Sequence, residues 1–375
     1  MKLIFRMHKV GLSFISHEGS RTLFVDFFSV LIGTAVTISL SASWVNANPL
    51  SQSVLSQIAQ SITVRVEGAT QGSGVLVKRD GDRYTVLTAW HVVSSQRGGE
   101  EVDIFTSDGQ KHSLLQGSIQ RLGKIDMAVL SFSSTKTYAL AQLGDVRQFK
   151  KGEPLLVAGF PIAKNSLLDL QTGELVANAL AGVDQGYQLL YTNQTNSGMS
   201  GGVILSSQGV LLGIHGRGEL DEIRTMQTGT ITKTGINQGV PVSYYQMYLA
   251  GSPVIAESAS LSTADDYLAM ARRLFDQPNR DREIIRLASL SLKNTESAEA
   301  YFLRGFSYEE IGQTQLAVED LNNSIRLNPS FMRALRYRGI VKEQQGNILG
   351  ACEDWSKAAS LGAKDASLWY RNQCA

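Results

Sequence analysis

The residue best suited to act as a nucleophile is Ser200, which lies in the run GMSGG (residues 198–202) just before the apolar segment VILS. An alcohol is a weak nucleophile near pH 7, so Ser200 needs a general base within hydrogen-bond reach and a partner that orients this base. The alternative is that Ser200 is only a small residue in a tight glycine turn. The histidines and aspartates of the chain decide between the two interpretations.

Histidine is the usual general base, and the chain has five histidines. His8 and His17 lie in an N-terminal segment that we do not expect to be part of the fold. His91 follows the apolar stretch YTVLTAW, which predicts a strand whose end would bury and fix the imidazole. His112 lies in the polar stretch SDGQKHS, which predicts a solvated loop. His91 is therefore the candidate base for Ser200.

Asp126 is the carboxylate best placed to orient His91. Six aspartates lie between His91 and Ser200, and only Asp126, in GKIDMAVLSF, opens an apolar strand that would bury its side chain. A buried carboxylate that accepts a hydrogen bond from a histidine holds the imidazole in one tautomer and orientation. The three residues together predict nucleophilic catalysis by a Ser-His-Asp triad.

Their order and local sequences resemble the trypsin-like serine endopeptidases, and most closely the cysteine-free bacterial branch. The resemblance rests on TAWH, which ends in His91, on DMAVL, which begins at Asp126, and on GMSGG around Ser200. It covers about residues 55–250 and implies two β-barrels with the active site between them. It also implies that Ser200 attacks a peptide carbonyl while the backbone N–H groups of Gly198 and Ser200 bind the oxyanion.

The same resemblance suggests a specificity pocket. The family position at the pocket base, six residues before the nucleophile, is Gln194, which offers no charge to a substrate Lys or Arg. Thr195 and the segment GIHGRG, with His215 and Gly218, resemble the pocket of the glutamyl endopeptidases. A hydroxyl and an imidazole can both donate to a carboxylate or a carboxamide. We therefore expect cleavage after Glu, or after Gln; the alternative is that His215 is a buried core histidine.

Two residues depart from the family pattern. Met199 stands where vertebrate relatives carry the aspartate that pairs with a newly cut N-terminus, so activation by that ion pair is excluded. Trp90 precedes His91 in place of the usual small residue. A relative that has lost catalysis and acts only as an adaptor is therefore the alternative to a working endopeptidase.

The elements that must position these residues are short strands. Between about residues 55 and 250, apolar or alternating segments such as ITVRVEG, GSGVLVKR, RYTVLTAW and GVLLGIHG are separated by turn segments such as RDGD and SDGQ. This spacing, without amphipathic helices between the strands, is typical of a β-barrel or sandwich. The expected fold is multidomain: an all-β double-barrel protease domain followed by an all-α domain.

The all-α part repeats itself every 34 residues. The matching pairs at this offset are Gly305 and Gly339, Gly312 and Gly346, Ala317 and Ala351, and Asp320 and Asp354. The pattern resembles the tetratricopeptide repeat, a helix-turn-helix unit in which small residues allow two helices to cross closely. We expect about three units and a capping helix.

A stack of such units forms a groove that binds peptides or proteins, so a protein partner is expected there in addition to the protein or peptide substrate. Phe302, Phe306, Arg336 and Ile340 are expected to line this groove at the repeat spacing. The alternative is that they pack partly against the protease domain.

The domain boundaries follow from these patterns. A basic start, an uncharged apolar stretch at residues 27–42 and the exit VNA predict a signal peptide or, if it is retained, a membrane anchor over residues 1–47. The protease domain is expected over residues 48–252, a linker over 253–263 and the repeats over 264–375. We therefore expect a secreted or periplasmic protein, which contacts a membrane only if the anchor remains.

Composition excludes other classes of function. The net charge of +1 gives no basic surface for nucleic acid. The two cysteines, Cys352 and Cys374, have no metal-site spacing, so no metal and no cofactor is expected. These cysteines are expected to lie on neighbouring helices, either as a disulfide or as two buried thiols.

Overall fold

The computed structural model of the chain describes residues 48–95, 101–164, 167–220, 233–255, 260–275, 277–293 and 295–374. The predicted signal or anchor segment, residues 1–47, lies outside the described residues. Among the residues that are described, no helix is long and apolar enough to cross a membrane.

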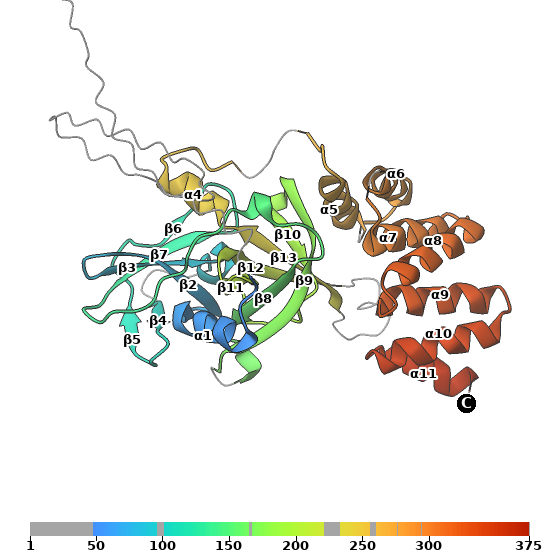
Figure 1. Ribbon diagram of the computed structural model, residues 1–375, viewed down its shortest axis with the longest axis horizontal. Coiled ribbons are helices and arrows are strands. Elements are labelled where there is room, and N and C mark those ends of the chain that lie inside the picture. The colour runs from blue at the N-terminus through green and yellow to red at the C-terminus, as the bar shows by residue number, and fades with distance from the viewer. Residues whose placement is uncertain are drawn as a thin grey trace, which may run out of the picture. The chain divides into compact units, whose positions relative to one another are not determined.

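Strands dominate the first part of the chain and helices the second, as the blue-to-yellow and orange-to-red ribbons of Figure 1 show. The strands are β1 (Thr63–Glu67), β2 (Gln71–Asp80), β3 (Arg83–Thr88), β4 (Asp103–Phe105), β5 (Lys111–Ser113), β6 (Gln120–Arg121), β7 (Ala128–Ser133), β8 (Pro154–Gly159), β9 (Asp169–Val183), β10 (Tyr187–Tyr191), β11 (Val203–Ser206), β12 (Leu211–Leu220) and β13 (Lys233–Pro241). The helices are α1 (Gln52–Ile62), α2 (Trp90–Val93), α4 (Ser243–Leu249), α5 (Ala264–Leu274), α6 (Asp281–Leu292), α7 (Ala298–Glu310), α8 (Thr314–Leu327), α9 (Met332–Gln344), α10 (Ile348–Ser360) and α11 (Lys364–Gln373).

The strands form two antiparallel sheets. The first has the order β5-β4-β1-β2-β3-β7-β6, and an isolated bridge between Leu114 and Phe132 links the residue after β5 to β7. The second, β10-β13-β12-β11-β8-β9, closes into a barrel. The predicted β-rich domain followed by a helical region is therefore confirmed, and the second sheet is fully closed.

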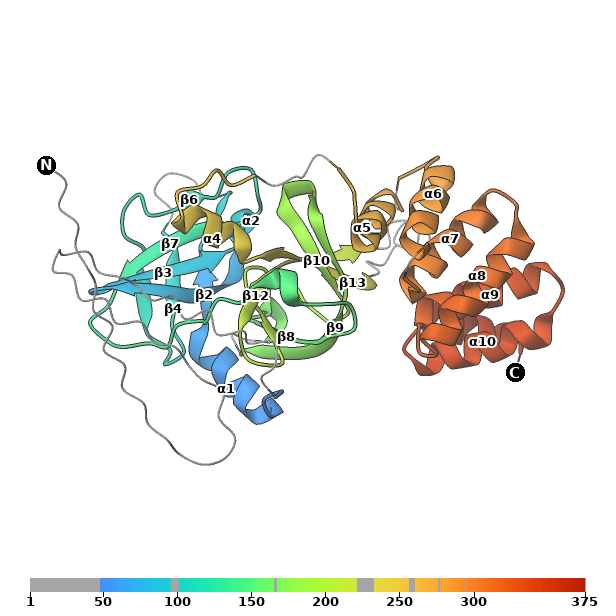
Figure 2. The ribbon, with the colours of Figure 1, turned by 45° about the horizontal axis from the view of Figure 1, so that its top comes forward.

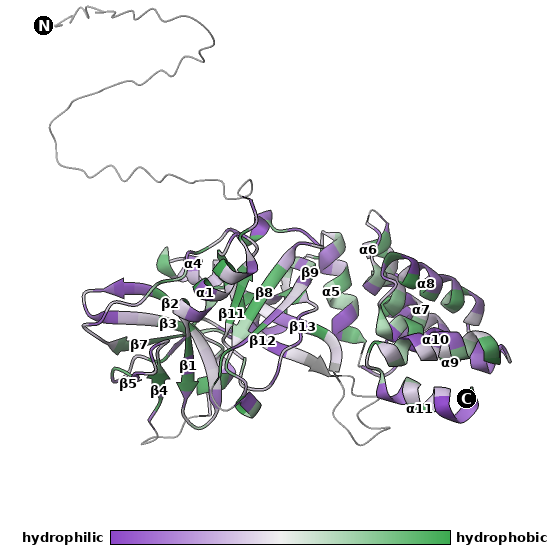
Figure 3. Cartoon of the chain, turned by 60° about the horizontal axis from the view of Figure 1, so that its bottom comes forward, coloured by the Kyte–Doolittle hydropathy of each residue, from purple (hydrophilic) through white to green (hydrophobic). Residues whose placement is uncertain are grey.

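The closed barrel is filled by the apolar residues that the sequence placed in its strands. Five of the six residues of β8 are buried, and Figure 3 shows this strand in the hydrophobic colour. Val157, Leu189, Ile204 and Leu212 form one core cluster. Met199 joins it from residues 192–202, the loop that carries the proposed nucleophile Ser200 and is called the nucleophile loop below. The residue in the place of the vertebrate aspartate thus anchors this loop in the barrel by burial of its side chain.

The described residues from 260 onward contain seven helices, α5–α11, and consecutive helices pack against each other (Figure 2). The same bidentate ion pair recurs at the predicted period: Arg304 binds Asp320 at 2.7 and 2.8 Å, and Arg338 binds Asp354 at 2.8 and 2.6 Å. Gly339 lies at a close helix crossing, where a Cβ atom would lie 2.4 Å from Trp355 Nε1. This geometry fits the predicted repeat unit.

The groove prediction is wrong for three of its four residues. Phe302, Phe306 and Arg336 are buried, with exposed fractions of 0%, 6% and 3%. The phenylalanines belong to an aromatic cluster, in which the ring of Phe306 lies 4.8 Å from that of Tyr337 and Phe302 also contacts Phe331. Large apolar side chains at the repeat spacing are used here to join neighbouring units, because burial gains more free energy than exposure.

Cys352 and Cys374 form a disulfide with a Cα–Cα distance of 5.7 Å. Cys352 lies on α10 and Cys374 directly follows α11. Of the two alternatives that the sequence left open, the structure therefore contains the disulfide, which ties the last helix to the one before it.

Candidate active site

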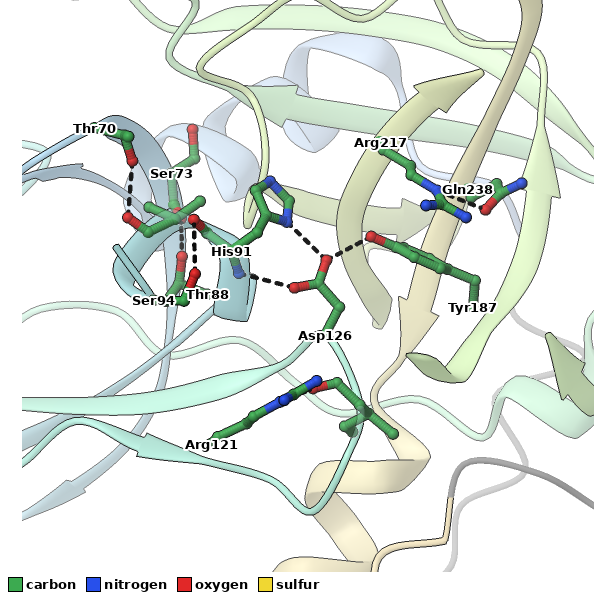
Figure 4. Close-up of polar contacts among 12 residues, drawn as sticks. Thr70, Ser73, Thr88, His91, Ser94, Arg121, Asp126, Tyr187, Arg217 and Gln238 are labelled. Carbon is green, nitrogen blue, oxygen red and sulfur yellow. Dashed lines mark hydrogen bonds and ion pairs between the residues drawn. The ribbon is translucent and has the colours of Figure 1, made fainter. Parts of the chain in front are cut away.

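His91 and Asp126 form a two-point contact (Figure 4). The ring Nδ1 of His91 lies 2.7 Å from Asp126 Oδ2, and the backbone N–H of His91 donates to Oδ1 at 2.9 Å. His91 does not end a strand as predicted: β3 ends at Thr88 and His91 lies in the short helix α2, with 46% of its side chain exposed. The predicted burial of the ring is therefore wrong, because the helical turn presents it to solvent while Asp126 fixes it from the inside.

The carboxylate of Asp126 is buried, as predicted, with an exposed fraction of 1%. The hydroxyl of Tyr187 also donates to Oδ2, at 2.5 Å. Burial raises the pKa of Asp126, but the contacts with His91 and Tyr187 outweigh burial, so the pKa lies below its ordinary value. The group is thus an anion that can orient the imidazole and stabilise its protonated form.

The residue after Ser200, Gly201, packs closely against the end of β3 and the residue that leads into α2. A Cβ atom on Gly201 would lie 2.4 Å from Thr88 Oγ1 and 2.9 Å from the backbone nitrogen of Ala89, just before α2. Gly201 also has φ +84°, so only glycine fits. Among the described contacts the hydroxyl of Ser200 has no hydrogen bond to His91; in unliganded enzymes this bond often forms only with substrate.

The nucleophile loop leaves two backbone N–H groups for a ligand. The N–H groups of Met199, Gly201 and Gly202 donate to carbonyl oxygens at 2.7–3.0 Å. Those of Gly198 and Ser200 have no acceptor among the residues that the structure describes. These are the two donors predicted to bind the oxyanion, and the loop keeps both available.

The neighbouring peptide bond fixes the direction of the Gly198 donor. The carbonyl of Ser197 accepts a hydrogen bond from the N–H of Ile162 at 2.9 Å. Because C=O and N–H of a trans peptide point in opposite directions, the N–H of Gly198 points away from Ile162. Gly198 has φ +97°, and a Cβ atom there would lie 2.5 Å from the carbonyl oxygen of Phe160, so this conformation requires glycine.

Ser73 of β2 joins the nucleophile loop to the first sheet. Its N–H donates to the carbonyl of Ser200 at 2.8 Å, and its hydroxyl donates to the carbonyl of Gly198 at 2.8 Å. The same hydroxyl accepts from the N–H of Phe160 at 2.8 Å, while Thr88 Oγ1 donates to the Ser73 carbonyl at 2.7 Å. Ser73 is fully buried, so these bonds are shielded from water.

The predicted pocket residues come from the loop before Ser200 and from β12. The hydroxyl of Thr195 is buried and donates to Asn237 Oδ1 of β13 at 2.5 Å. A Cβ atom on Gly218 would lie 3.7 Å from Thr195 Oγ1, which places these two predicted residues together. Gln194 is exposed.

His215 is buried, with 2% exposed, and its backbone is tied to the nucleophile loop. Its carbonyl accepts from Gly201 N–H at 2.7 Å and its N–H donates to the carbonyl of Gly202 at 2.8 Å. The ring Nδ1 lies 2.6 Å from the hydroxyl of Tyr191. Burial raises the pKa of Tyr191 well above its ordinary value, so this partner is a neutral hydroxyl.

Sequence reasoning missed Ser73, Tyr187 and Tyr191. Each lies in a strand where its side chain is indistinguishable, by pattern alone, from an ordinary core residue. The prediction for His112 was also wrong: its ring packs 4.6 Å from that of Phe132, and Nε2 lies 3.1 Å from the hydroxyl of Tyr138.

Comparison with known proteins agrees with this geometry. The family model of the trypsin-like peptidase domain matches residues 72–214. This range contains His91, Asp126 and Ser200. The β-rich part of the chain thus has the features of a trypsin-like serine protease domain.

The similar curated proteins are serine proteases by name. The Serine protease Do-like HtrA of Lactococcus lactis subsp. lactis (strain IL1403) is 26% identical over 192 residues, which are 49% of this chain and 45% of the relative. The Serine protease Do-like HtrB of Bacillus subtilis (strain 168) is 30% identical over 151 residues, 38% of this chain and 32% of the relative. The chain therefore spans less than half the length of these relatives.

Proposed function

We propose that this protein is an extracytoplasmic serine endopeptidase that works through a Ser-His-Asp acyl-enzyme mechanism. The observation that carries the proposal is the buried carboxylate of Asp126 bound to His91 Nδ1 at 2.7 Å. The loop around Ser200 adds two N–H groups that have no acceptor within the described part of the chain. His91 Nε2 would accept the proton of Ser200 as the hydroxyl attacks the substrate carbonyl. The tetrahedral oxyanion would accept hydrogen bonds from Gly198 and Ser200.

After the attack, the imidazolium of His91 would protonate the leaving amine and so release the first product. A water molecule would then take the place of Ser200 as the attacking group, with His91 again as the base. Throughout the cycle Asp126 stays ionised, which its lowered pKa supports. The 46% exposure of His91 leaves its ring accessible from the solvent side.

For specificity we propose Glu, or Gln, as the residue before the cleaved bond. The buried His215 would hold the terminal group of this side chain and Gly218 would leave room for it. The Thr195 hydroxyl would have to turn from Asn237 Oδ1 to the substrate to donate to it as well. The hydroxyl of Tyr191 lies 2.6 Å from Nδ1 of His215, which fixes the orientation of the ring. A donating Tyr191 favours the neutral ring with a proton on Nε2, which suits either a carboxylate or a carboxamide.

The proposed extracytoplasmic location is supported by the disulfide, and the proposed tetratricopeptide repeats are supported by the periodicity of the helical region. The disulfide between Cys352 and Cys374 is of a kind that persists in oxidising compartments, which favours export of the chain. The 34-residue period and the recurring Arg-Asp pairs favour tetratricopeptide repeats over residues 264–375. We propose that these repeats bind a protein or peptide.

Labelling of the serine tests the activity. A fluorophosphonate probe should label the mature protein and should not label Ser200→Ala or His91→Ala. Ser197→Ala is a matched control, because it removes an exposed hydroxyl of the same loop and should keep the label. Asp126→Asn should lower turnover by about 10⁴-fold. Absence of labelling in the folded wild-type chain would favour the alternative, an inactive adaptor whose repeats carry the function.

Cleavage-site profiling with a peptide library tests the specificity. The expected preference is Glu before the cleaved bond, then Gln, with little cleavage after Lys, Arg or Phe. His215→Ala should cost about 1.5–3 kcal/mol, or roughly 10- to 100-fold, on Glu peptides and much less on neutral ones. A Glu-to-Gln ratio that falls as the pH rises would mean that the protonated ring binds the substrate. A preference for aliphatic or basic residues would make His215 a core residue and leave the triad intact.

A further inference from the structure

The buried hydroxyl of Tyr187 lies against the triad rather than in the apolar core. It donates to Asp126 Oδ2 at 2.5 Å, the same oxygen that His91 Nδ1 contacts at 2.7 Å (Figure 4). The side chain of Tyr187 is 2% exposed, so water does not compete for this bond. Asp126 Oδ2 is thus held between one donor from α2 and one from β10.

The fold makes room for this tyrosine at one position of β12. A Cβ atom on Gly216 would lie 2.1 Å from Tyr187 Cε1 and 3.0 Å from its hydroxyl oxygen. Any other residue at 216 would therefore displace the ring and break its contact with Asp126. Gly216 directly follows His215, so the strand that carries the proposed pocket also shapes the site of Tyr187.

A second contact fixes the ring of Tyr187. The guanidinium of Arg217 lies 4.5 Å from the ring centroid, and its Nε donates to Gln238 Oε1 of β13 at 3.1 Å. A cation over an aromatic face is attracted by the electrons of the ring. The ring of Tyr187 thus packs against Gly216 and Arg217 of β12, with its hydroxyl directed at the carboxylate.

From these contacts we infer that Tyr187 is a positioning residue of the catalytic triad, which fixes the ionised Asp126 and disperses its charge so that His91 is held in its working orientation. The inference rests on the proposed function. The charged groups that face the tyrosine are Asp126, Arg217 and Asp184. Burial, and then the charge of Asp126, raises the pKa of Tyr187 well above its ordinary value, so the hydroxyl remains a donor at every pH at which a protease works.

Loss of the Tyr187 hydroxyl should change the pH dependence of activity in one direction, which can be measured. Without this donor the negative charge of Asp126 is less dispersed, so the imidazolium of His91 is stabilised more strongly. The acid limb of the pH profile of kcat/KM should then move to higher pH. The carboxylate also loses one of its anchors, so the imidazole is oriented less well and turnover falls.

The experiment compares Tyr187→Phe with wild type over pH 4–9. The plateau of kcat/KM should fall by about 3- to 30-fold and the midpoint of the acid limb should rise by roughly 0.5–1 pH unit, since a hydrogen bond to a charged group is being lost. The matched control is Tyr84→Phe, which removes a buried hydroxyl that donates to the Lys136 carbonyl at 2.9 Å in the first sheet. Tyr84→Phe should lower the stability of the protein without moving the acid limb of the pH profile of kcat/KM. A plateau and a limb equal to wild type in Tyr187→Phe would overturn the inference, as would a loss of rate with an unmoved limb.

A second readout separates this inference from the proposed function. Titration of the His91 ring protons by NMR needs no turnover, and Tyr187→Phe should raise the titration midpoint of His91 alone. If the protein proved inactive but the midpoint moved, the proposed activity would fall and the positioning role would stand. If the protein were active and the midpoint stayed, Tyr187 would be only a core residue.

Discussion

Ser73→Ala is the substitution that most directly tests how the loop with the two proposed oxyanion donors is held. The serine hydroxyl donates to the carbonyl of Gly198 and accepts from the N–H of Phe160, both at 2.8 Å, and the site is fully buried. Alanine keeps the backbone bond from residue 73 to the carbonyl of Ser200 and removes only the two side-chain bonds. The loop thus loses the hydrogen bond from the Ser73 side chain, while the amino-acid sequence of the loop itself is unchanged.

The magnitude follows from the two groups left without a partner. A buried donor or acceptor that loses its hydrogen bond costs about 1–3 kcal/mol, so Ser73→Ala should lower the free energy of unfolding by about 2–6 kcal/mol if no water enters. About 1–3 kcal/mol of this cost comes from the carbonyl of Gly198, and this part destabilises the conformation of the nucleophile loop. Since 1.4 kcal/mol corresponds to a factor of ten, a loss of about 3 kcal/mol lowers the population of the loop conformation seen in the structure by up to about 150-fold. We expect kcat/KM to fall by an amount between a few-fold and this limit.

The assay combines the rate of fluorophosphonate labelling, kcat/KM on an ester substrate and the thermal midpoint. Thr88→Val is the matched control, because it removes the 2.7 Å bond to the Ser73 carbonyl but leaves both bonds of the Ser73 hydroxyl. It should lower stability and change the labelling rate by less than about threefold, since the oxyanion donors stay in place. If Ser73→Ala labelled as fast as Thr88→Val, the idea that this hydroxyl holds the loop would be refuted.

Three further predictions concern stability. Reduction of the Cys352–Cys374 bond, which spans 22 residues, should cost about 3 kcal/mol and should appear as lost hydrogen-exchange protection in α11; equal protection with and without reductant would contradict it. Gly339→Ala should cost about 1–3 kcal/mol in urea unfolding, because its Cβ would lie 2.4 Å from Trp355 Nε1, and an unchanged midpoint would show that the helices adjust freely. Burial raises the pKa of Asp266, but hydrogen bonds from backbone N–H groups outweigh burial, so the pKa lies below its ordinary value. The contribution of Asp266 to the free energy of unfolding is therefore present above its unfolded pKa and is lost as the pH falls through the folded pKa. Asp266→Asn should remove this acid-dependent part of the wild-type unfolding curve.

The order of the three proposed triad residues and the class of the fold could be read from the sequence because they depend on local sequence. A histidine after TAW, an aspartate that opens an apolar strand and a serine among glycines each have a setting that a short segment defines. The strands follow from alternating apolar residues, and the helical region from a 34-residue period. Burial of Asp126 followed in the same way from the apolar strand that it precedes.

What surrounds the proposed triad was decided only by the tertiary structure. The hydroxyl of Ser73 contacts a carbonyl 125 positions away, and that of Tyr187 contacts a carboxylate 61 positions away. No local pattern marks such residues, since a buried serine or tyrosine in a strand has the same neighbours in sequence whether its hydroxyl meets a backbone group or a catalytic one. The exposed ring of His91 and the buried rings of Phe302 and Phe306 were likewise set by which surfaces meet when the chain folds. Sequence thus determined which chemical groups are present and on which elements they lie, while the packing of distant strands and helices determined what each group touches.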